Sequence, residues 1–407
     1  MKTVSIFISA IVAFYFAAGV YSNNAAGGDA ESVTRSRVSR ACDQNLIKEF
    51  LSVFPENKSP SSDNLLCSAA TEYSSMLASM PVLPSRLDPI LVRPFLWKHG
   101  KGDFHFLPLT VTLTGTKLDA GVLRQFAESV TREGCNSCGI GQSEIKSNEG
   151  RITTVICVRG SAGISSVPLR VAVGSALPLK GRLARGYKNP RIFVSAPSGI
   201  VSKTIPAIKG GGSFSANLRL DGGMGKYMVE VMADGPEGGE VIFLLPVYME
   251  MSPVEANKDL SILLEFFEPD EYVDEAGAEY LIAESVRKER KKMELSPLIV
   301  DGAVSEAARL KCRAMIAKEK FVHDIKGKSK DDVLSTAGVE YSSSLENIAV
   351  NVSPAAAHYM LMASPAHRAN VINPAMTHFG VGVVKLPDSD EFCITELFVR
   401  KGAGGGI

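Results

Sequence analysis

Two histidines and one glutamate in the last third of the chain have the residue types of a polar or metal-binding site. His323 stands in the stretch FVHD, Glu346 in LENIA and His367 in SPAHRANVINP. Spacings of 23 and 21 residues place them on separate elements, so only the tertiary fold can bring them together. Two imidazoles and a carboxylate suit a divalent ion such as zinc with an open fourth position. The same groups could also form a hydrogen-bonded network without a metal, and spacing alone does not choose.

The segments around these residues predict the elements that position them. Residues 276–293 are typical of a charged helix, and residues 305–318 of a second helix with Ser305 as its N-cap. We expect Glu346 to open another helical stretch. The β-prone runs FGVGVV and ITELFVR predict two closing strands.

These motifs, in this order, resemble a known family. Residues from about 275 to 402 are similar to the CAP superfamily of cysteine-rich secretory, antigen 5 and pathogenesis-related proteins, in its compact bacterial SCP-like form. The resemblance runs through ERKKMELSPLIVD, SEAARLKCRAMIAKEKFVH, SLENIAV, SPAHRANVINPAMTHFGVGVV and ITELFVR. It implies a CAP α-β-α sandwich over residues 258–402, about one third of the chain. It also implies that Glu346 is the site glutamate and that His323 and His367 are the site histidines.

The sequence departs from the family pattern at three positions. Leu345 replaces the usual glycine before the glutamate, and Leu361 stands where the family has tryptophan. Ala363 lies where eukaryotic members carry a second site glutamate nearby. Without a second carboxylate, Glu346 cannot be both a metal ligand and a general base. The three candidates are therefore predicted to be cleft residues and the ligands of any zinc ion, and no residue is predicted to be catalytic.

Other residues near the site are expected to have structural roles. His358 lies in a helical stretch and is expected to be a partly exposed surface histidine. Asn347 and Arg368 are expected to brace loops. Cys312 and Cys393 could form a disulfide if the second helix and a late strand pack together, and the sequence leaves this open.

Residues 165–250 have a different pattern. Short β-prone runs alternate with Gly/Pro turns, which predicts a β-sandwich. The APSG turn and a Gly-Lys-Tyr entry into a strand resemble Ig-like adhesion or spacer modules. No cluster of titratable groups stands out, so this domain is expected to position its neighbours rather than to react.

Residues 42–160 predict an N-terminal α+β unit. Apolar periodicity predicts helices over 63–80 and 118–130, and ITTVICV predicts a strand over 152–158. GIG at 139–141 matches GVG at 380–382 at an offset of 241, and Thr154 then matches Thr395. If this faint repeat is real, the unit is a degenerate copy of the CAP domain. Phe126 would replace His367 in that copy, which would be inert.

The N-terminus predicts export. A basic residue followed by a long apolar run indicates a signal peptide over residues 1–22, followed by a polar linker over 23–41. An uncleaved membrane anchor is the alternative. The chain has seven cysteines, and an exported chain can form disulfides. For the lone C-x-x-C of Cys135 and Cys138, a structural disulfide or simple burial is favoured over redox chemistry.

Composition narrows the function. The 407 residues include 44 basic and 44 acidic side chains, and zero net charge argues against nucleic acid as a partner. We predict an exported multidomain α+β protein, secreted or held in the periplasm or cell envelope. Its CAP domain is predicted to bind small apolar ligands or partner surfaces without catalysis; the resemblance implies sterols or fatty acids. The alternatives are a structural cell-envelope protein and, less favoured, a metal-assisted hydrolase.

Overall fold

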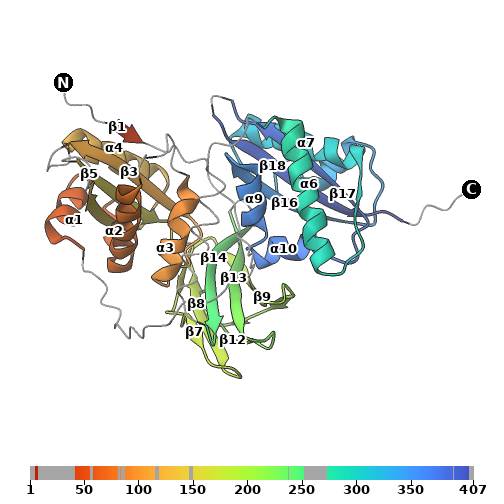
Figure 1. The fold of residues 1–407 in the computed structure, drawn as a ribbon. Coiled ribbons are helices and arrows are strands. Elements are labelled where there is room, and N and C mark those ends of the chain that lie inside the picture. Colours follow the sequence, from red (N-terminus) through yellow and green to blue (C-terminus); the bar gives the residue numbers. More distant parts are fainter. Residues whose placement is uncertain are drawn as a thin grey trace, which may run out of the picture. The chain divides into compact units, whose positions relative to one another are not determined.

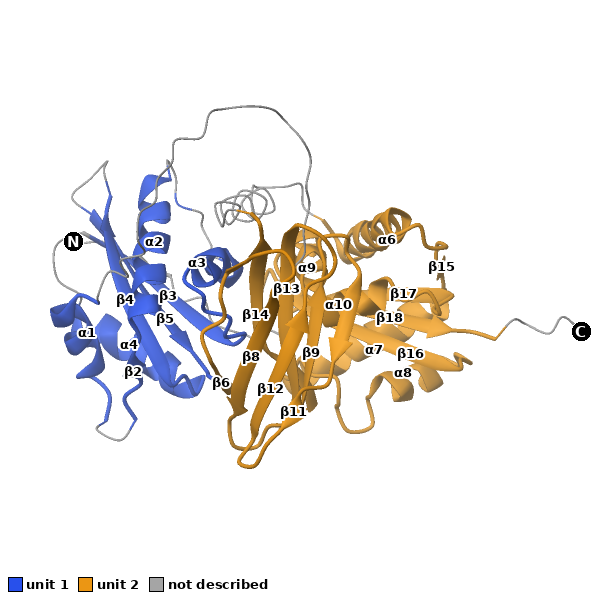
Figure 2. Ribbon diagram, turned by 90° about the horizontal axis from the view of Figure 1, so that it is seen from below, with its two compact units in different colours: residues 1–10, 20–160 blue, residues 11–19, 161–407 orange. Residues whose placement is uncertain are grey.

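The computed structural model of the chain describes residues 5–7, 42–55, 58–80, 83, 88–114, 119–145, 150–236, 238–251, 273–387 and 389–402. The chain divides at Gly160/Ser161 into two compact units (Figure 2). The predicted signal peptide and the linker after it lie outside the described residues, except for the short strand β1 (Ser5–Phe7). In the described ranges, no helix is long and apolar enough to cross a membrane.

The C-terminal part of the second unit is a four-stranded sheet covered by helices. Its strand order is β15-β17-β18-β16, with β15 parallel to β17 and the other pairs antiparallel. Strands β16, β17 and β18 are labelled in Figure 1. Strand β18 is buried at every residue except its last. Because side chains alternate between the two faces of a strand, this burial requires cover on both faces. The elements are α6 (Glu275–Lys292), β15 (Ile299–Val300), α7 (Gly302–Lys318), α8 (Lys330–Thr336), β16 (Ser343–Asn351), α9 (Pro354–Leu361), α10 (Pro365–Val371), β17 (His378–Lys385) and β18 (Phe392–Arg400).

Two sequence predictions in this part are wrong. The N-cap of α7 is Asp301, not Ser305: its carboxylate accepts the amides of Ala303 and Val304 at 2.9 and 3.1 Å. Glu346 lies on strand β16, not in a helix, because the whole run from Ser343 pairs antiparallel with β18. The next helix begins only at Pro354, a residue suited to the first helical turn.

Helix α7 packs closely on strand β17 because that strand has two glycines. A Cβ atom on Gly380 would lie 2.2 Å from the backbone nitrogen of Ser305, and one on Gly382 would lie 2.2 Å from that of Arg309. No side chain fits in either place, so the GVG motif fixes how closely helix and sheet approach.

Residues 161–251, here called the β-region, form two sheets with strand orders β10-β9-β13-β14-β7 and β11-β12-β8-β6 (Figure 2). The Tyr227 hydroxyl donates to the carbonyl of Gly223 at 2.7 Å, with that of Leu220 at 3.1 Å. The strands are β6 (Ala162–Ile164), β7 (Arg170–Val171), β8 (Ala176–Leu183), β9 (Lys188–Ser195), β10 (Val201–Thr204), β11 (Ala207–Ile208), β12 (Ser213–Arg219), β13 (Gly225–Gly235) and β14 (Gly238–Met249).

The first unit is a five-stranded sheet with the order β1-β3-β5-β4-β2, in which only β2 and β4 are parallel. The predicted helices and strand are confirmed as α2, α4 and β5, with Asp63 as the N-cap of α2. The elements are α1 (Gln44–Leu51), β2 (Ser61–Ser62), α2 (Asn64–Ser79), a 3-10 turn η1 (Pro89–Val92), α3 (Arg93–Lys98), β3 (Phe106–Thr114), α4 (Ala120–Arg132), β4 (Ser137–Glu144) and β5 (Gly150–Val158).

The first unit and the C-terminal sheet follow the same plan. In each, a two-residue strand runs parallel to the first strand of a closing hairpin, and an Asp-capped helix follows that short strand. Gly139 and Gly141 admit α2 as Gly380 and Gly382 admit α7. Buried polar contacts also match across each helix–sheet interface. Ser74 bonds to Gly141 O and Thr154, and Cys312 to Gly382 O and Thr395.

The cysteines divide between the two units. Disulfides join Cys42 to Cys67 and Cys138 to Cys157, both in the first unit. Cys135 is not bonded, so the C-x-x-C pair does not close on itself. Cys312 and Cys393 are buried thiols that contact each other without a disulfide.

Candidate functional site

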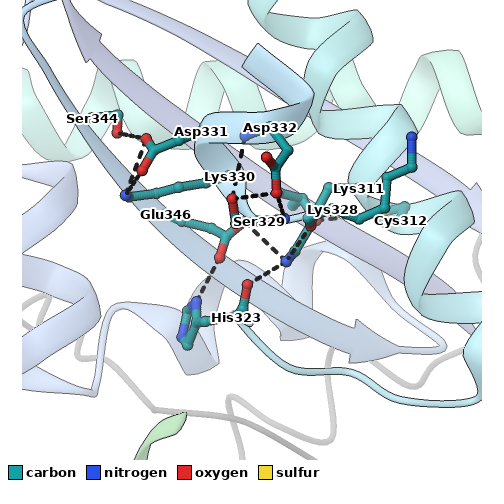
Figure 3. A network of polar contacts seen from close by, with 11 residues as sticks. Lys311, Cys312, His323, Lys328, Ser329, Lys330, Asp331, Asp332, Ser344 and Glu346 are labelled. Atoms are coloured by element: carbon teal, nitrogen blue, oxygen red, sulfur yellow. Dashed lines mark hydrogen bonds and ion pairs between the residues drawn. The ribbon is translucent and has the colours of Figure 1, made fainter. Parts of the chain in front are cut away.

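His323 and Glu346 form the centre of the site. His323 follows α7 in the loop toward α8, and Glu346 projects from β16 (Figure 3). His323 Nδ1 and Glu346 Oε2 lie 2.6 Å apart. The glutamate side chain is 3% exposed and the histidine side chain 30% exposed, so the imidazole is the part of the pair that reaches solvent.

A buried lysine lies on the other side of Glu346. Lys311 Nζ, from α7, donates to the carbonyl oxygens of His323 and Lys328 and lies 3.9 Å from Glu346 Oε1 (Figure 3). Its side chain is completely buried, and this burial lowers its pKa while the Glu346 carboxylate acts to raise it. The sequence analysis missed this residue. The sequence feature that could have identified Lys311 is its position on the apolar face of the helix, one turn after Ala307 and Ala308.

His367 lies at the start of α10 and is buried. Its Nδ1 is 2.9 Å from the hydroxyl of Ser364, the N-cap of the helix. Burial, followed by the charge of His323, lowers the pKa of His367 to about 3, so the ring is neutral at physiological pH.

Asparagines connect α10 to β16. Asn347 donates to the backbone carbonyl of His367 at 3.2 Å, and Asn370 donates to that of Glu346 at 3.1 Å. Asn370 also donates to the side-chain oxygen of Asn347 at 2.8 Å. The structure therefore brings all three predicted site residues into one polar neighbourhood, with Asn347 as the expected brace.

A second buried histidine–carboxylate pair lies behind the site. His358, expected on the surface, is buried on α9, and its Nδ1 is 3.3 Å from Glu396 Oε1 on β18. Glu396 also accepts from Asn347 at 2.9 Å. The surface prediction for His358 is wrong because its helix presents this position to a strand that carries a buried carboxylate.

Among the described residues, no group of three or more His, Cys, Asp or Glu side chains is placed to hold a metal ion. The Nδ1 atom of His323 is engaged by Glu346 and that of His367 by Ser364. The Lys311 ammonium group faces the other Glu346 oxygen, where it would repel a cation bound to that oxygen.

Two arginines hold the helices that surround the site. Arg290, almost fully buried on α6, donates to the carbonyl oxygens of Val371 and Asn373, both at 2.9 Å. Arg368 lies 3.3 Å from Glu289, also on α6. Both arginines therefore brace α10, as expected for Arg368.

Comparisons with known proteins match the C-terminal part of the chain. The model of the CAP, cysteine-rich secretory protein family matches residues 284–398. The chain is 36% identical over 106 residues to the uncharacterized protein YkwD of Bacillus subtilis; the match covers 26% of this chain and 41% of that protein. The chain thus spans about two fifths of that relative's length.

Solved structures also match part of the chain. One is an extracellular SCP-domain protein of Bacillus anthracis, with 20% identity, a TM-score of 0.30 and coverage of 48% of this chain and 67% of that one. Another is an outer surface protein of Borrelia burgdorferi, with 16% identity, a TM-score of 0.30 and coverage of 33% of this chain and 100% of that one. From the sequence matches, residues 284–398 of this chain are a CAP domain of the cysteine-rich secretory protein family.

Proposed function

We propose that His323, Glu346 and His367 form a non-catalytic binding site of an exported protein. The observation that carries this proposal is that two members of the trio are sealed from solvent: the Glu346 side chain is 3% exposed and His367 is buried, which leaves the His323 ring as the exposed group. The Nδ1 atoms of His323 and His367 are held by Glu346 and Ser364. This arrangement fixes the rings and leaves the second nitrogen of the exposed His323 ring for a ligand.

Hydrolysis by a serine nucleophile has little support in this arrangement. Ser364 lies 2.9 Å from His367 Nδ1, which is the separation of a serine–histidine pair. However, Ser364 has no exposed surface, and its oxygen already accepts the backbone amide of His367 as the helix cap. A hydroxyl that is sealed in this way cannot reach a carbonyl carbon.

The binding proposal is tested on the full-length protein. Small apolar molecules would be extracted from the purified protein and identified by mass spectrometry, and a peptide library would be screened for turnover. We expect a bound lipid-like molecule and no turnover. An empty extract would favour the structural-envelope alternative, and turnover that disappears in Glu346→Ala would establish a hydrolase and overturn the proposal.

Zinc is tested separately. We propose that the polar network is complete without metal, because the Lys311 ammonium is placed against the only carboxylate of the trio. Calorimetric titration with zinc should give the same heat for the full-length protein and for His323→Ala. A heat that is present in the wild type and lost in the variant would restore the zinc site.

We also propose that the protein acts outside the cytoplasm, either secreted or in the cell envelope. Two disulfides in the first unit support this, because such bonds persist in oxidising compartments. Fractionation of the producing cell tests it, and the full-length protein in the cytosol with reduced thiols would contradict it.

Finally, we propose that the first unit is a degenerate CAP copy, and that the β-region is Ig-like. The first proposal is supported by the strand order that the first unit shares with the C-terminal sheet. The second is supported by Tyr227, whose hydroxyl donates to the carbonyl oxygen of Gly223 four residues upstream, like the conserved corner tyrosine of Ig-like sandwiches. Register places Pro108 where the CAP domain has Glu346, since each pairs with the strand residue that faces the first glycine. Phe126 stands at the repeat position of His367, so the copy is expected to lack the polar site.

A further inference from the structure

Helix α10, which carries His367, is held from outside the CAP domain. Glu230, on strand β13 of the β-region, accepts the backbone amide of Ala366 at 3.1 Å. Gly199, in the turn between β9 and β10, accepts from Arg368 Nε at 2.9 Å. The β-region therefore contacts the residues immediately before and after His367.

The position of Glu230 is unusual for a carboxyl group. Its strand partners are Phe193 on β9 and Leu244 on β14, and the side chain has no exposed surface. Burial raises its pKa to about 8, and only Ser364 and the amide of Ala366 act in the opposite direction. Its Oε1 atom accepts the Ala366 amide, and its Oε2 atom is buried without a hydrogen-bond partner among the described residues. An apolar side chain would cost less at this position if its only task were to fill the core.

The hydroxyl of Ser364 is the side-chain group that acts against the raised pKa of Glu230. Its oxygen lies 2.9 Å from His367 Nδ1 and accepts the His367 amide at 3.2 Å. A hydroxyl has one proton and two lone pairs. With one lone pair used by the amide, one donor and one acceptor remain for the carboxyl and the imidazole together. A hydrogen bond between Ser364 and Glu230 would therefore fix whether the Ser364 hydroxyl donates to His367 Nδ1 or accepts a hydrogen bond from it.

We propose that Glu230 is a positioning residue of the CAP site: acting through the Ser364 hydroxyl, it fixes the orientation and tautomer of the His367 imidazole. The β-region is then part of the site rather than only a spacer. The proposal does not depend on which ligand the cleft binds, because it concerns the state of one ring in the unliganded protein.

The test is nitrogen-15 NMR of the histidine rings in the full-length protein, with the His367 signals assigned from His367→Gln. Glu230→Met removes the carboxyl at similar volume. It should shift the His367 Nδ1 signal and speed exchange of the Ala366 amide about tenfold, the effect of one lost hydrogen bond. Glu230→Gln keeps an acceptor for the Ala366 amide and a polar group of the same size beside Ser364. The Ala366 exchange rate should therefore return to the wild-type value, and the His367 Nδ1 signal should move back toward it.

Glu289→Met is the matched control, because Glu289 braces the same helix through Arg368 without contacting Ser364. It should leave the His367 Nδ1 signal in place. Equal shifts in Glu289→Met and Glu230→Met would reduce the role of Glu230 to general helix docking and overturn the proposal, as would unchanged signals in Glu230→Met. If Glu230→Met does not fold, Ser364→Ala is measured instead. A shifted His367 Nδ1 signal with a protected Ala366 amide would support the action of Glu230 through Ser364. An unshifted signal would refute it.

Discussion

A single buried ammonium group determines how the site carboxylate is used. Lys311 has no exposed side-chain surface, and its three N–H donors face two carbonyl oxygens and Glu346. Desolvating an ammonium group costs several kcal/mol, which is offset here by these partners. The Lys311 ammonium group is therefore a buried cation that faces the Glu346 carboxylate.

Replacing Lys311 by methionine tests this account. Lys311→Met keeps the aliphatic volume but leaves Glu346 Oε1 without its cation and two carbonyls without their donor. We expect the free energy of unfolding to fall by about 3 kcal/mol, the cost of breaking a buried pair. Chemical denaturation of the second unit measures it. The double variant with Glu346→Gln should lose less than the sum of the two single variants, whereas simple additivity would show that the charges do not interact.

The buried carboxyl of Glu230 predicts a pH dependence of stability. Its folded pKa of about 8 lies above the usual value of 4.5, so the folded state retains a proton that the unfolded state loses between these values. The associated stability is complete below about pH 4.5 and is lost as the pH rises toward 8. Relative to Glu230→Gln, the wild type should lose up to about 4 kcal/mol over this window. Urea unfolding across this pH range measures the difference, and parallel curves would refute the raised pKa.

The sequence could identify the residues that lie in recognisable motifs, and it missed those that do not. His323, Glu346 and His367 could be named because FVHD, LENIA and SPAHR have a fixed order. Lys311 and Glu230 lie in an ordinary helix and an ordinary strand, and their roles depend on partners 35 and 136 residues away. In the sequence, such a residue is visible only as one charged residue within an otherwise apolar stretch. For Glu230 this stretch is the buried run from Tyr227 to Val231.

At the scale of elements, the close approach of α7 to β17 holds the site together. Helix α7 carries Lys311 and leads into His323, so its distance from the sheet sets where both residues lie. Two glycines on β17 permit this distance, since a Cβ on either would meet helix backbone rather than a movable side chain.

Gly382→Ala should therefore be costly despite its small size. The added methyl group would lie 2.2 Å from the Arg309 nitrogen, so the helix must move away from the sheet. We expect a loss of about 3 kcal/mol, the upper range for overpacking a core, and a shift in the His323 ring signals. Gly402→Ala, which has open space around its Cβ, is the control and should behave like the wild type. Equal stability of the two variants would contradict the packing argument.

Element types were predictable where the pattern was long, and boundaries were not. The helix of residues 276–293 is found at Glu275–Lys292, because 18 helical residues dominate any local ambiguity. Glu346 was assigned to a helix because Leu-Glu-Asn-Ile-Ala has good helix formers. It forms a strand because pairing with β18 buries the run from Glu346 to Asn351, and tertiary burial outweighs such weak preferences.

At the scale of the whole molecule, the two units differ in how they are stabilised. The first unit and the C-terminal sheet share a plan and have matching glycines where a helix packs on the sheet, but both disulfides lie in the first unit. In the second unit, buried polar pairs such as His358–Glu396 occupy the interior. The cysteine pairing could not be inferred from the sequence, because seven cysteines allow many connectivities.

The C-x-x-C pair gives a reciprocal test of this pairing. If Cys138 bonds Cys157, then Cys157→Ser opens a loop of 19 residues and should destabilise the first unit by about 3 kcal/mol. Cys135→Ser should then change little, because Cys135 is not bonded. If Cys135 and Cys138 were the true pair, the two variants would exchange their effects. Thermal unfolding of both variants, with and without reductant, distinguishes the cases: reductant should lower the stability of Cys135→Ser toward that of Cys157→Ser and leave the transition of the second unit in place.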